Sequence, residues 1–229
     1  MFEARIVKRR RDFVVDVAIS MGAGSAIGLF GPSGAGKSSV LSCIAGLEEP
    51  DDGFVRIGEA QLFPPSTPLY VRPIGYMTQD ANVFPHLTVA ENVGFGVNGP
   101  RDREWIAELR DRLELRSLWT VAASRVSGGQ ARRVALARML ARRPALVLLD
   151  EPFAGLDRTT VRGLLEDLLA WQVRLGFSMF VVDHQVQVLE RLCSQAIVLE
   201  AGRLIQSGTW GELRRTPATP LLAQLLEPL

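Results

Sequence analysis

The stretch Gly31-Pro32-Ser33-Gly34-Ala35-Gly36-Lys37-Ser38 matches the pattern G-x-x-x-x-G-K-[ST]. It follows a short apolar segment, residues 25–30, and precedes a segment with helical character, residues 38–47. Glycines let backbone N–H groups wrap around phosphate oxygens, and the N-terminal end of a helix adds positive charge. Lys37 is expected to reach the β- and γ-phosphates of a nucleotide, and the Ser38 hydroxyl to bind Mg²⁺. A chance match is expected in roughly one chain in a hundred of this length, so the stretch predicts a phosphate-binding loop.

A second informative stretch is Leu146-Val147-Leu148-Leu149-Asp150-Glu151, an apolar strand that ends in two acids. By itself it is weak evidence, because many parallel strands end in a carboxylate. Beside a phosphate-binding loop, Asp150 stands where a Mg²⁺-holding acid belongs. Glu151 would then orient or deprotonate an attacking water. The alternative for Glu151 is an acid at the start of a helix.

Apolar strands alternate with helical segments along most of the chain, which predicts a parallel α/β sheet. The N-terminal segment of residues 1–11 is charged and shows no apolar region of a secretory signal. Residues 63–73 form a proline-rich connector after a short turn at residues 58–61, and the middle of the chain looks like a helical insertion. The expected strands cover residues 13–19, 25–30, 53–57, 74–77, 146–149, 179–182 and 196–199, and the expected helices cover residues 38–47, 102–115, 130–143 and 159–175.

The composition excludes several classes of protein. The chain has 229 residues, 47% of them hydrophobic, and a net charge of +1, so it lacks the basic excess of a nucleic-acid-binding surface. No apolar run is long enough to span a bilayer. Two cysteines, Cys43 and Cys193, make neither a disulfide framework nor a metal site. We expect both to pack as small core residues in a reducing compartment.

A third motif makes the family resemblance explicit. Val126-Ser127-Gly128-Gly129-Gln130 precedes the expected helix of residues 130–143. Ser127 and two glycines before a helix could be an ordinary N-cap. Ahead of an acid-ended strand, however, the stretch resembles the L-S-G-G-Q signature of the ABC ATPase family, with Val126 in place of leucine.

The other elements of that family follow in order, so the resemblance covers nearly the whole chain. Gln79 resembles the glutamine that contacts Mg²⁺ and the attacking water. Asp157, in Ala154-Gly155-Leu156-Asp157, resembles the D-loop aspartate, and His184 resembles the switch histidine that contacts the γ-phosphate. Ser39 would join the phosphate-binding loop in holding the nucleotide, and in this family the signature residues Ser127, Gly128, Gly129 and Gln130 contact it as well.

The resemblance implies one domain over residues 1–229. Its fold is a P-loop NTPase core with a mostly parallel sheet, a small N-terminal antiparallel β subdomain and an inserted α-helical subdomain. Residues 1–79 and 144–229 would form the core, and residues 80–143 the helical subdomain. Because the chain ends soon after the core, we expect no added C-terminal regulatory domain.

The sequence departs from the family pattern at two places. Asp183 stands before His184, where the family usually has serine or threonine; it could tune the histidine or only face solvent. No tyrosine precedes the phosphate-binding loop to stack on the adenine. Phe13 or an arginine at residues 9–11 is the candidate for that contact.

The resemblance also implies the assembly. Two copies of the chain would sandwich two ATP molecules between the phosphate-binding loop of one and the signature of the other. ATP binding would close the pair and hydrolysis reopen it. The partners would be integral membrane permeases at the cytoplasmic face of the cell membrane, with the helical region forming the groove for their coupling helices and an extracytoplasmic solute-binding protein completing the system.

The cargo is harder to predict from the sequence. The stretch of residues 79–89, with Q-D-A-x-x-F-P-H, resembles importers of molybdate and related oxyanions. Thiamine, polyamine and iron importers share parts of the pattern. A soluble ABC ATPase of cofactor assembly is the alternative from another class. Relatives in DNA repair and translation carry long coiled coils or two cassettes, which this chain has no room for.

Overall fold

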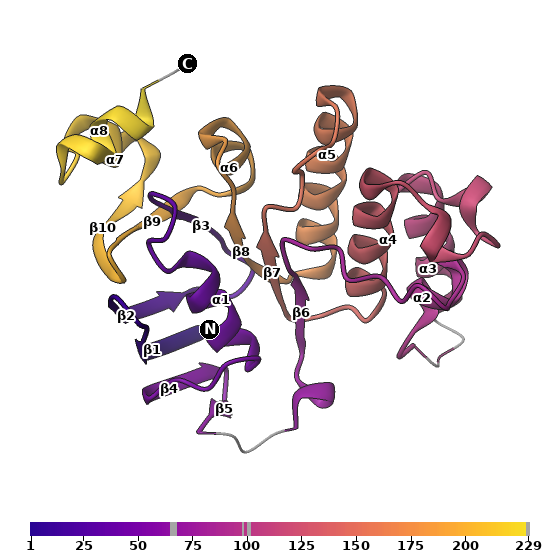
Figure 1. Cartoon of the computed structure of the whole chain (residues 1–229), viewed down its shortest axis with the longest axis horizontal. Coiled ribbons are helices and arrows are strands. Elements are labelled where there is room, and N and C mark those ends of the chain that lie inside the picture. Colours follow the sequence, from indigo (N-terminus) through magenta and orange to yellow (C-terminus); the bar gives the residue numbers. More distant parts are fainter. Residues whose placement is uncertain (65–67, 98, 100–101, 228–229) are drawn as a thin grey trace.

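A single twisted sheet runs through the part of the chain that the computed structural model describes, residues 1–64, 68–97, 99 and 102–227 (Figure 1). Its strand order is β5-β4-β1-β2-β10-β9-β3-β8-β7-β6. The strands are β1 (Phe2–Arg9), β2 (Val14–Met21), β3 (Ala26–Phe30), β4 (Asp52–Ile57), β5 (Ala60–Phe63), β6 (Ile74–Met77), β7 (Leu146–Asp150), β8 (Ser178–Val182), β9 (Gln195–Glu200) and β10 (Arg203–Thr209).

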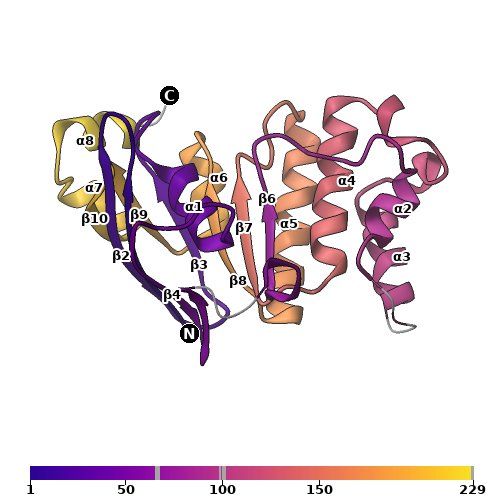
Figure 2. The ribbon, with the colours of Figure 1, turned by 60° about the horizontal axis from the view of Figure 1, so that its bottom comes forward.

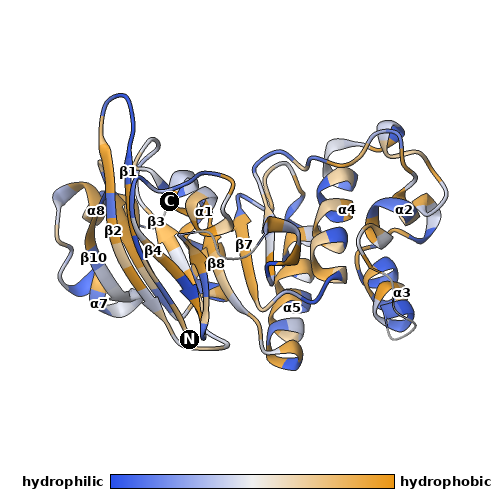
Figure 3. Cartoon of the chain, turned by 90° about the horizontal axis from the view of Figure 1, so that it is seen from below, coloured by the Kyte–Doolittle hydropathy of each residue, from blue (hydrophilic) through white to orange (hydrophobic). Residues whose placement is uncertain are grey.

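The five strands β9, β3, β8, β7 and β6 are parallel, and they form the centre of the fold. Alternate residues of β7 enter two different hydrophobic cores: Leu146 and Leu148 one, Val147 and Leu149 the other. Both faces of these strands are therefore covered, which explains why β7 and β8 read as continuous apolar runs (Figure 3).

The helices cover both faces of the parallel strands. They are α1 (Lys37–Ala45), α2 (Val89–Gly94), α3 (Asp102–Arg112), α4 (Gly128–Ala141), α5 (Arg158–Leu175), α6 (Val186–Leu192), α7 (Trp210–Arg215) and α8 (Pro220–Leu226). The short 3-10 helices η1 (Leu69–Val71), η2 (Arg116–Leu118) and η3 (Ala123–Arg125) lie in connections. Helix α1 sits between the N-terminal strands and the parallel strands, and α2, α3 and α4 form a helical region beyond β6 (Figure 2).

The N-terminal strands differ from the sequence prediction. The structure places an eight-residue strand, β1, in the charged segment for which we expected no strand. Phe2, Ala4 and Ile6 are buried, whereas the charged residues between them lie on the other face. Gln61, expected in a turn, is part of β5. Charged side chains on the outer face conceal the two-residue alternation of such a strand.

Each predicted strand and helix agrees with an observed element within one to three residues, whereas β10, α2, α6, α7 and α8 were not predicted. The structure confirms the predicted fold class, a parallel α/β core with N-terminal antiparallel strands and inserted helices. Helix α1 ends at Ala45, two residues before the expected end, because Gly46 adopts a left-handed conformation and caps it. Cys43 and Cys193 are buried free thiols, as expected. Residues 65–67 of the proline-rich connector lie outside the described residues.

Candidate functional site

The loop between β3 and α1 is closed around its own lysine. The Lys37 ammonium donates to the carbonyls of Gly31 at 2.9 Å and Pro32 at 2.8 Å. Gly31 has φ 138°, and a Cβ there would lie 2.0 Å from the carbonyl oxygen of Leu199, so only glycine fits. Gly36, with φ 98°, begins the helix. The loop thus encloses one buried cation, Lys37, with two of its own carbonyl oxygens.

Two buried charges of opposite sign lie at the base of this loop. Burial lowers the pKa of Lys37, although Asp150 and Glu151 act against that shift. Burial raises the pKa of the Asp150 carboxyl, although its hydrogen bond with Ser38 acts in the opposite direction. Burial therefore disfavours the charged form of each group, and the opposite charge of the other group offsets this in part.

The donor set around Asp150 fits Mg²⁺. Among the described residues, no cluster of three or more His, Cys, Asp or Glu side chains could hold a metal ion by itself. Magnesium in nucleotide sites does not need one, because it is bound by one or two carboxylates together with phosphates and water. The Ser38 hydroxyl and the Asp150 carboxylate, which contact each other, supply hard oxygen ligands of this kind.

Three predicted catalytic side chains meet beside the loop. The Glu151 carboxylate accepts a hydrogen bond from Gln79 Nε2 at 3.2 Å and lies 2.6 Å from His184 Nε2. Glu151 has φ 51°, an uncommon value for a residue other than glycine. Its backbone N–H bonds to the carbonyl of Val182 at 2.9 Å, so the turn after β7 is fixed to the end of β8. Residues from the ends of β6, β7 and β8 therefore converge on one point.

Asp183 does not face solvent, which answers one question left open by the sequence. It is 7% exposed, and its carboxylate accepts the backbone N–H of Gln185 at 2.8 Å. Burial raises the pKa of Asp183, and the nearby Glu151 charge raises it further. The carboxylate therefore braces the turn that carries His184.

A cavity of about 690 Å³ opens above these groups. It is lined by Lys37, Ser38, Ser39, Gln79, Glu151 and His184, by Ser33, Gly34 and Gly36 of the loop, and by residues 10–13 of the turn between β1 and β2. Phe13 packs over Gly36, since a Cβ on Gly36 would lie 3.2 Å from the Phe13 ring. The Arg10 side chain is held by the Ser39 hydroxyl at 2.7 Å. Phe13 and Arg11 also line the cavity. Pro32 and Ala35 of the loop do not line the cavity; Ala35 is buried and Pro32 is half-buried.

The signature residues are not part of this cavity. Ser127 caps α4 in a capping box, in which its hydroxyl accepts the Gln130 N–H at 3.3 Å and Gln130 Oε1 accepts the Ser127 N–H at 2.9 Å. Gly128 and Gly129 open the helix. Asp157 caps α5 by accepting the N–H groups of Thr159 and Thr160, both at 3.0 Å. A single chain therefore leaves these residues apart from the loop at Lys37.

Two residues of the site, Tyr76 and Arg132, were not predicted from the sequence. The Tyr76 hydroxyl lies 3.5 Å from Asp150, and burial raises the pKa of this phenol to about 12. Arg132, on α4, donates to the backbone carbonyl of Glu151 at 3.0 Å. A tyrosine inside a strand and an arginine on a charged helix are common features, so only the three-dimensional contacts identify them.

Comparison with known proteins gives a family match. The model of the ABC transporter family matches residues 14–154. That range begins within β2 and includes the phosphate-binding loop, Gln79, the signature, Asp150 and Glu151. The match therefore covers more than half of the chain and most of the candidate site.

Curated relatives carry names for the import of different ions. The chain is 42% identical over 214 residues to an Fe(3+) ions import ATP-binding protein of Pseudomonas fluorescens, 39% over 220 residues to a molybdenum import ATP-binding protein of Rhodopseudomonas palustris, and 37% over 213 residues to a sulfate/thiosulfate import ATP-binding protein of Chromobacterium violaceum. The alignments cover 89%, 91% and 91% of this chain, but only 59%, 57% and 58% of the relatives. The chain thus spans less than two thirds of their length.

Solved structures give the same fold. A dimeric ATP-binding cassette in a post-hydrolysis state, bound to ADP and Pi, matches with a TM-score of 0.80 and 27% identity, over 91% of this chain and 98% of that one. An ATP-binding subunit of an ABC transporter matches with a TM-score of 0.87 over 99% of this chain and 100% of that one, at 24% identity. The architecture is therefore that of an ATP-binding cassette.

Proposed function

Because the chain belongs to the ABC transporter family, we propose that it binds ATP with Mg²⁺ and hydrolyses it to drive import through membrane permeases. The observation that carries the proposal is the meeting of Glu151, Gln79 and His184 beside the loop that holds Lys37. A phosphate-binding loop alone would support binding. A carboxylate placed next to it by two further side chains supports hydrolysis.

Each residue of the loop has a proposed role in binding. Lys37 exchanges its contacts with the carbonyls of Gly31 and Pro32 for the β- and γ-phosphates of ATP. Ser38, Asp150 and Gln79 hold Mg²⁺, which when bound neutralises phosphate charge. Ser33, Gly34, Ala35, Gly36 and Ser39 complete the cradle, and Phe13 stacks on the base.

Glu151 is the proposed general base. One oxygen of its carboxylate contacts Gln79 and the other contacts His184. These two contacts fix the orientation of the carboxylate. His184 is more than half exposed at its side chain, which leaves it able to contact the γ-phosphate. In hydrolysis, Glu151 takes a proton from the attacking water while His184 and Lys37 hold the phosphate.

A second copy of the chain is the proposed partner at the nucleotide. Ser127 to Gln130 form a helix N-terminus, where N–H groups and the helix dipole favour an anion. They do not line the cavity of their own chain. Placed over the ATP of a second copy, they would complete its site, with Asp157 at the interface. A cassette of the same fold is dimeric, which supports this arrangement.

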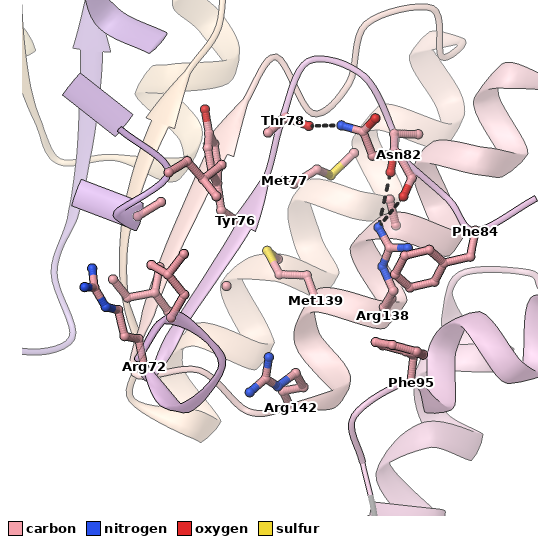
Figure 4. A pocket seen from close by; sticks show the side chains of 17 residues that line it. Arg72, Tyr76, Met77, Thr78, Asn82, Phe84, Phe95, Arg138, Met139 and Arg142 are labelled. Carbon is pink, nitrogen blue, oxygen red and sulfur yellow. Dashed lines mark hydrogen bonds between the residues drawn. The ribbon is translucent and has the colours of Figure 1, made fainter. Parts of the chain in front are cut away.

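Integral membrane permeases are the proposed partners on another face. We retain the division into a core, residues 1–79 and 144–229, and a helical subdomain, residues 80–143. A groove of about 470 Å³ lies between them beside Gln79 (Figure 4). Leu47, Leu69 and Phe95, which line it, are exposed. The groove suits a coupling helix of a permease at the cytoplasmic face of the membrane.

No helix in the described part of the chain has the length and hydropathy needed to cross a bilayer. A solute-binding protein would deliver the cargo to the permeases.

The proposed cargo is a small inorganic ion. Relatives of similar identity are named for Fe(3+), molybdenum and sulfate/thiosulfate. Molybdate, suggested by residues 79–86, is therefore one candidate among oxyanions, with ferric iron as the other class. Loss of the gene should impair growth when the true cargo is scarce. Rescue by excess molybdate, sulfate or ferric iron separates the candidates, whereas rescue by thiamine or a polyamine would contradict the proposal.

Glu151→Gln tests the proposed hydrolysis. The amide keeps the shape of the side chain but removes the base, so turnover should fall by about a hundredfold or more. ATP should still bind, and the pair should persist as a closed dimer, measured by size-exclusion chromatography in ATP. Glu166→Gln, on the exposed surface of α5, is the control. Normal hydrolysis by Glu151→Gln, or a variant that binds ATP and stays monomeric, would contradict the proposal.

A further inference from the structure

The segment from Met77 to Phe84 separates the groove from the nucleotide cavity. Thr78 lines the groove, whereas the next residue, Gln79, lines the cavity. Ala81, Asn82 and Phe84 return to the groove (Figure 4). This short segment therefore contributes Gln79 to the nucleotide cavity and its neighbouring residues to the groove.

The segment around Gln79 is closed by its own hydrogen bonds. The Thr78 hydroxyl donates to the carbonyl of Asp80 at 2.7 Å, and Asn82 Nδ2 donates to the Thr78 hydroxyl at 2.8 Å. Asn82 has φ 45°, in the left-handed region. Gln79 lies inside this turn, so a displacement of Asn82 displaces Gln79 as well.

Arg138, on α4, holds this turn from the groove side. Its guanidinium donates to the carbonyl of Asn82 at 2.8 Å and to that of Ala81 at 3.5 Å (Figure 4). It also lies over the Phe84 ring, with 4.6 Å between Cζ and the ring centroid. These partners are neutral dipoles and a π face, and burial lowers the pKa of Arg138. The charge is thus held by oriented carbonyls that belong to the segment itself.

A buried amide links the same arginine to the end of the segment. Asn92 is fully buried, and its Oδ1 accepts from the Phe84 N–H at 2.8 Å and from Arg138 at 3.3 Å. Its Nδ2 donates to the Phe84 carbonyl at 3.1 Å. The segment is therefore clamped at Asn82 and at Phe84, with Arg138 common to both clamps.

The same helix also fixes the strand before Gln79. A Cβ on Gly75 of β6 would lie 2.5 Å from Met139 Cγ, so this glycine allows close packing between β6 and α4. Arg138 and Met139 thus hold the chain on both sides of Gln79. We propose that Arg138 is a positioning residue for ATP hydrolysis, which sets Gln79 by holding the turn at Asn82 against α4.

The position of Arg138 exposes it to two influences, movement of helix α4 and an occupant of the groove. Helix α4 begins at the signature, about 15 Å from Arg138 along the helix axis at 1.5 Å per residue. An occupant of the groove would contact Arg138 directly, because this side chain lines it. Movement of the helix or filling of the groove therefore reaches Gln79 through the same hydrogen bonds. The inference rests on the proposed hydrolysis and on the proposed role of Gln79.

The test compares Arg138→Met with the unmutated full chain in ATP and Mg²⁺. Methionine keeps an apolar side chain of similar length but has no donor for the carbonyls. Because a small misplacement of a catalytic group is costly, kcat should fall by about ten- to a hundredfold. The Kd for ATP should stay unchanged, since Arg138 does not line the nucleotide cavity. Arg138→Lys, with one donor group retained, should recover part of kcat.

Arg133→Met is the matched control. Arg133 lies on the same helix and also donates to a backbone carbonyl, that of Leu113 at 3.3 Å, but on the α3 side. It should lose thermal stability and keep kcat. A normal kcat in Arg138→Met, or a loss of ATP affinity equal to the loss of kcat, would overturn the inference. If Arg138→Met does not fold, Arg138→Lys is tested in its place, and a kcat equal to that of the unmutated chain would overturn the inference.

Gln79→Ala, measured in parallel, separates this inference from the proposed function. Low turnover in Gln79→Ala with normal turnover in Arg138→Met would reject the positioning role alone. Normal turnover in Gln79→Ala would reject the proposed role of Gln79 and this inference but leave the proposed hydrolysis intact. No turnover in the unmutated chain would reject the proposed hydrolysis and, with it, this inference.

Discussion

The nucleotide cavity and the signature helix differ in how completely one chain builds them. Around the cavity, the ends of β6, β7 and β8 bring Gln79, Glu151 and His184 into direct contact. At the start of α4, Ser127 and Gln130 contact mainly each other, in a capping box. In the first region the proposed catalytic side chains contact one another within one chain, whereas the second region has only the contacts that any well-capped helix has.

The difference follows from where the residues lie in the fold. The carboxyl ends of adjacent parallel strands meet at one edge of a sheet, so side chains there converge without help from another chain. A helix N-terminus needs a ligand or another molecule opposite it to become a site. The comparison predicts that substitutions at the cavity act within one chain, and substitutions at the signature act through the pair.

The largest effect is expected for Lys37→Ala. This substitution removes the only cation in the loop, which now bridges two carbonyls. ATP binding should weaken and turnover should be lost, as measured by nucleotide titration and phosphate release. Lys8, the only other lysine, bonds to the carbonyl of Glu49 at 2.8 Å. Lys8→Ala should therefore behave as the unmutated chain, and unchanged activity in Lys37→Ala would refute the loop assignment.

Ser127→Ala should lower turnover by about a hundredfold, because it removes a hydrogen-bonding group that would face the phosphate in the proposed pair. Loss of the cap should also cost about 1 kcal/mol of stability. Thr209→Ala is the control, since Thr209 forms the same kind of capping box on α7. If both variants lose stability and neither loses turnover, Ser127 is only a helix cap.

Phe13→Ala should raise the Kd for ATP by about ten- to a hundredfold, the factor that corresponds to one base–aromatic stack. Turnover at saturating ATP should change little, because the phosphate contacts remain. Titration of ATP and GTP against both proteins measures the effect. Equal ATP affinity of both proteins would exclude Phe13 and leave Arg11, which lines the same cavity, as the candidate.

The smallest effect is expected for Asp183→Asn, which should raise Tm near neutral pH. Burial raises the pKa of Asp183 above its ordinary value of 3.8, so the folded chain loses this proton at higher pH than the unfolded chain. The free-energy cost of ionising the buried Asp183 carboxyl is absent below pH 3.8 and grows as the pH rises toward its raised pKa. Asparagine avoids that cost and can still accept the Gln185 N–H.

Thermal unfolding of both proteins across this pH range gives the comparison. The difference in Tm should vanish in acid, where Asp183 is neutral in both states. A lower Tm for Asp183→Asn at neutral pH would mean that contacts to the ionised carboxylate outweigh its burial.

Much of the fold could be predicted because its signals are local. The parallel strands are continuous apolar runs, and Pro144 marks the end of the helix before β7. The end of α1 at Gly46 was missed by two residues. Strand β1 was missed because its outward face is charged. The environment of Asp183 could not be predicted, since its burial depends on how β8 and the following turn pack.

The sequence by itself determined the phosphate-binding loop, the acid-ended strand β7 and the signature, because each is set by neighbouring residues and their backbone preferences. Only the tertiary structure decided that Gln79, Glu151 and His184 touch, and that Arg138 holds the turn at Asn82. Such contacts join residues more than thirty positions apart in the chain. They depend on strand order and helix packing, which bring distant segments together and leave no mark on the sequence around each residue.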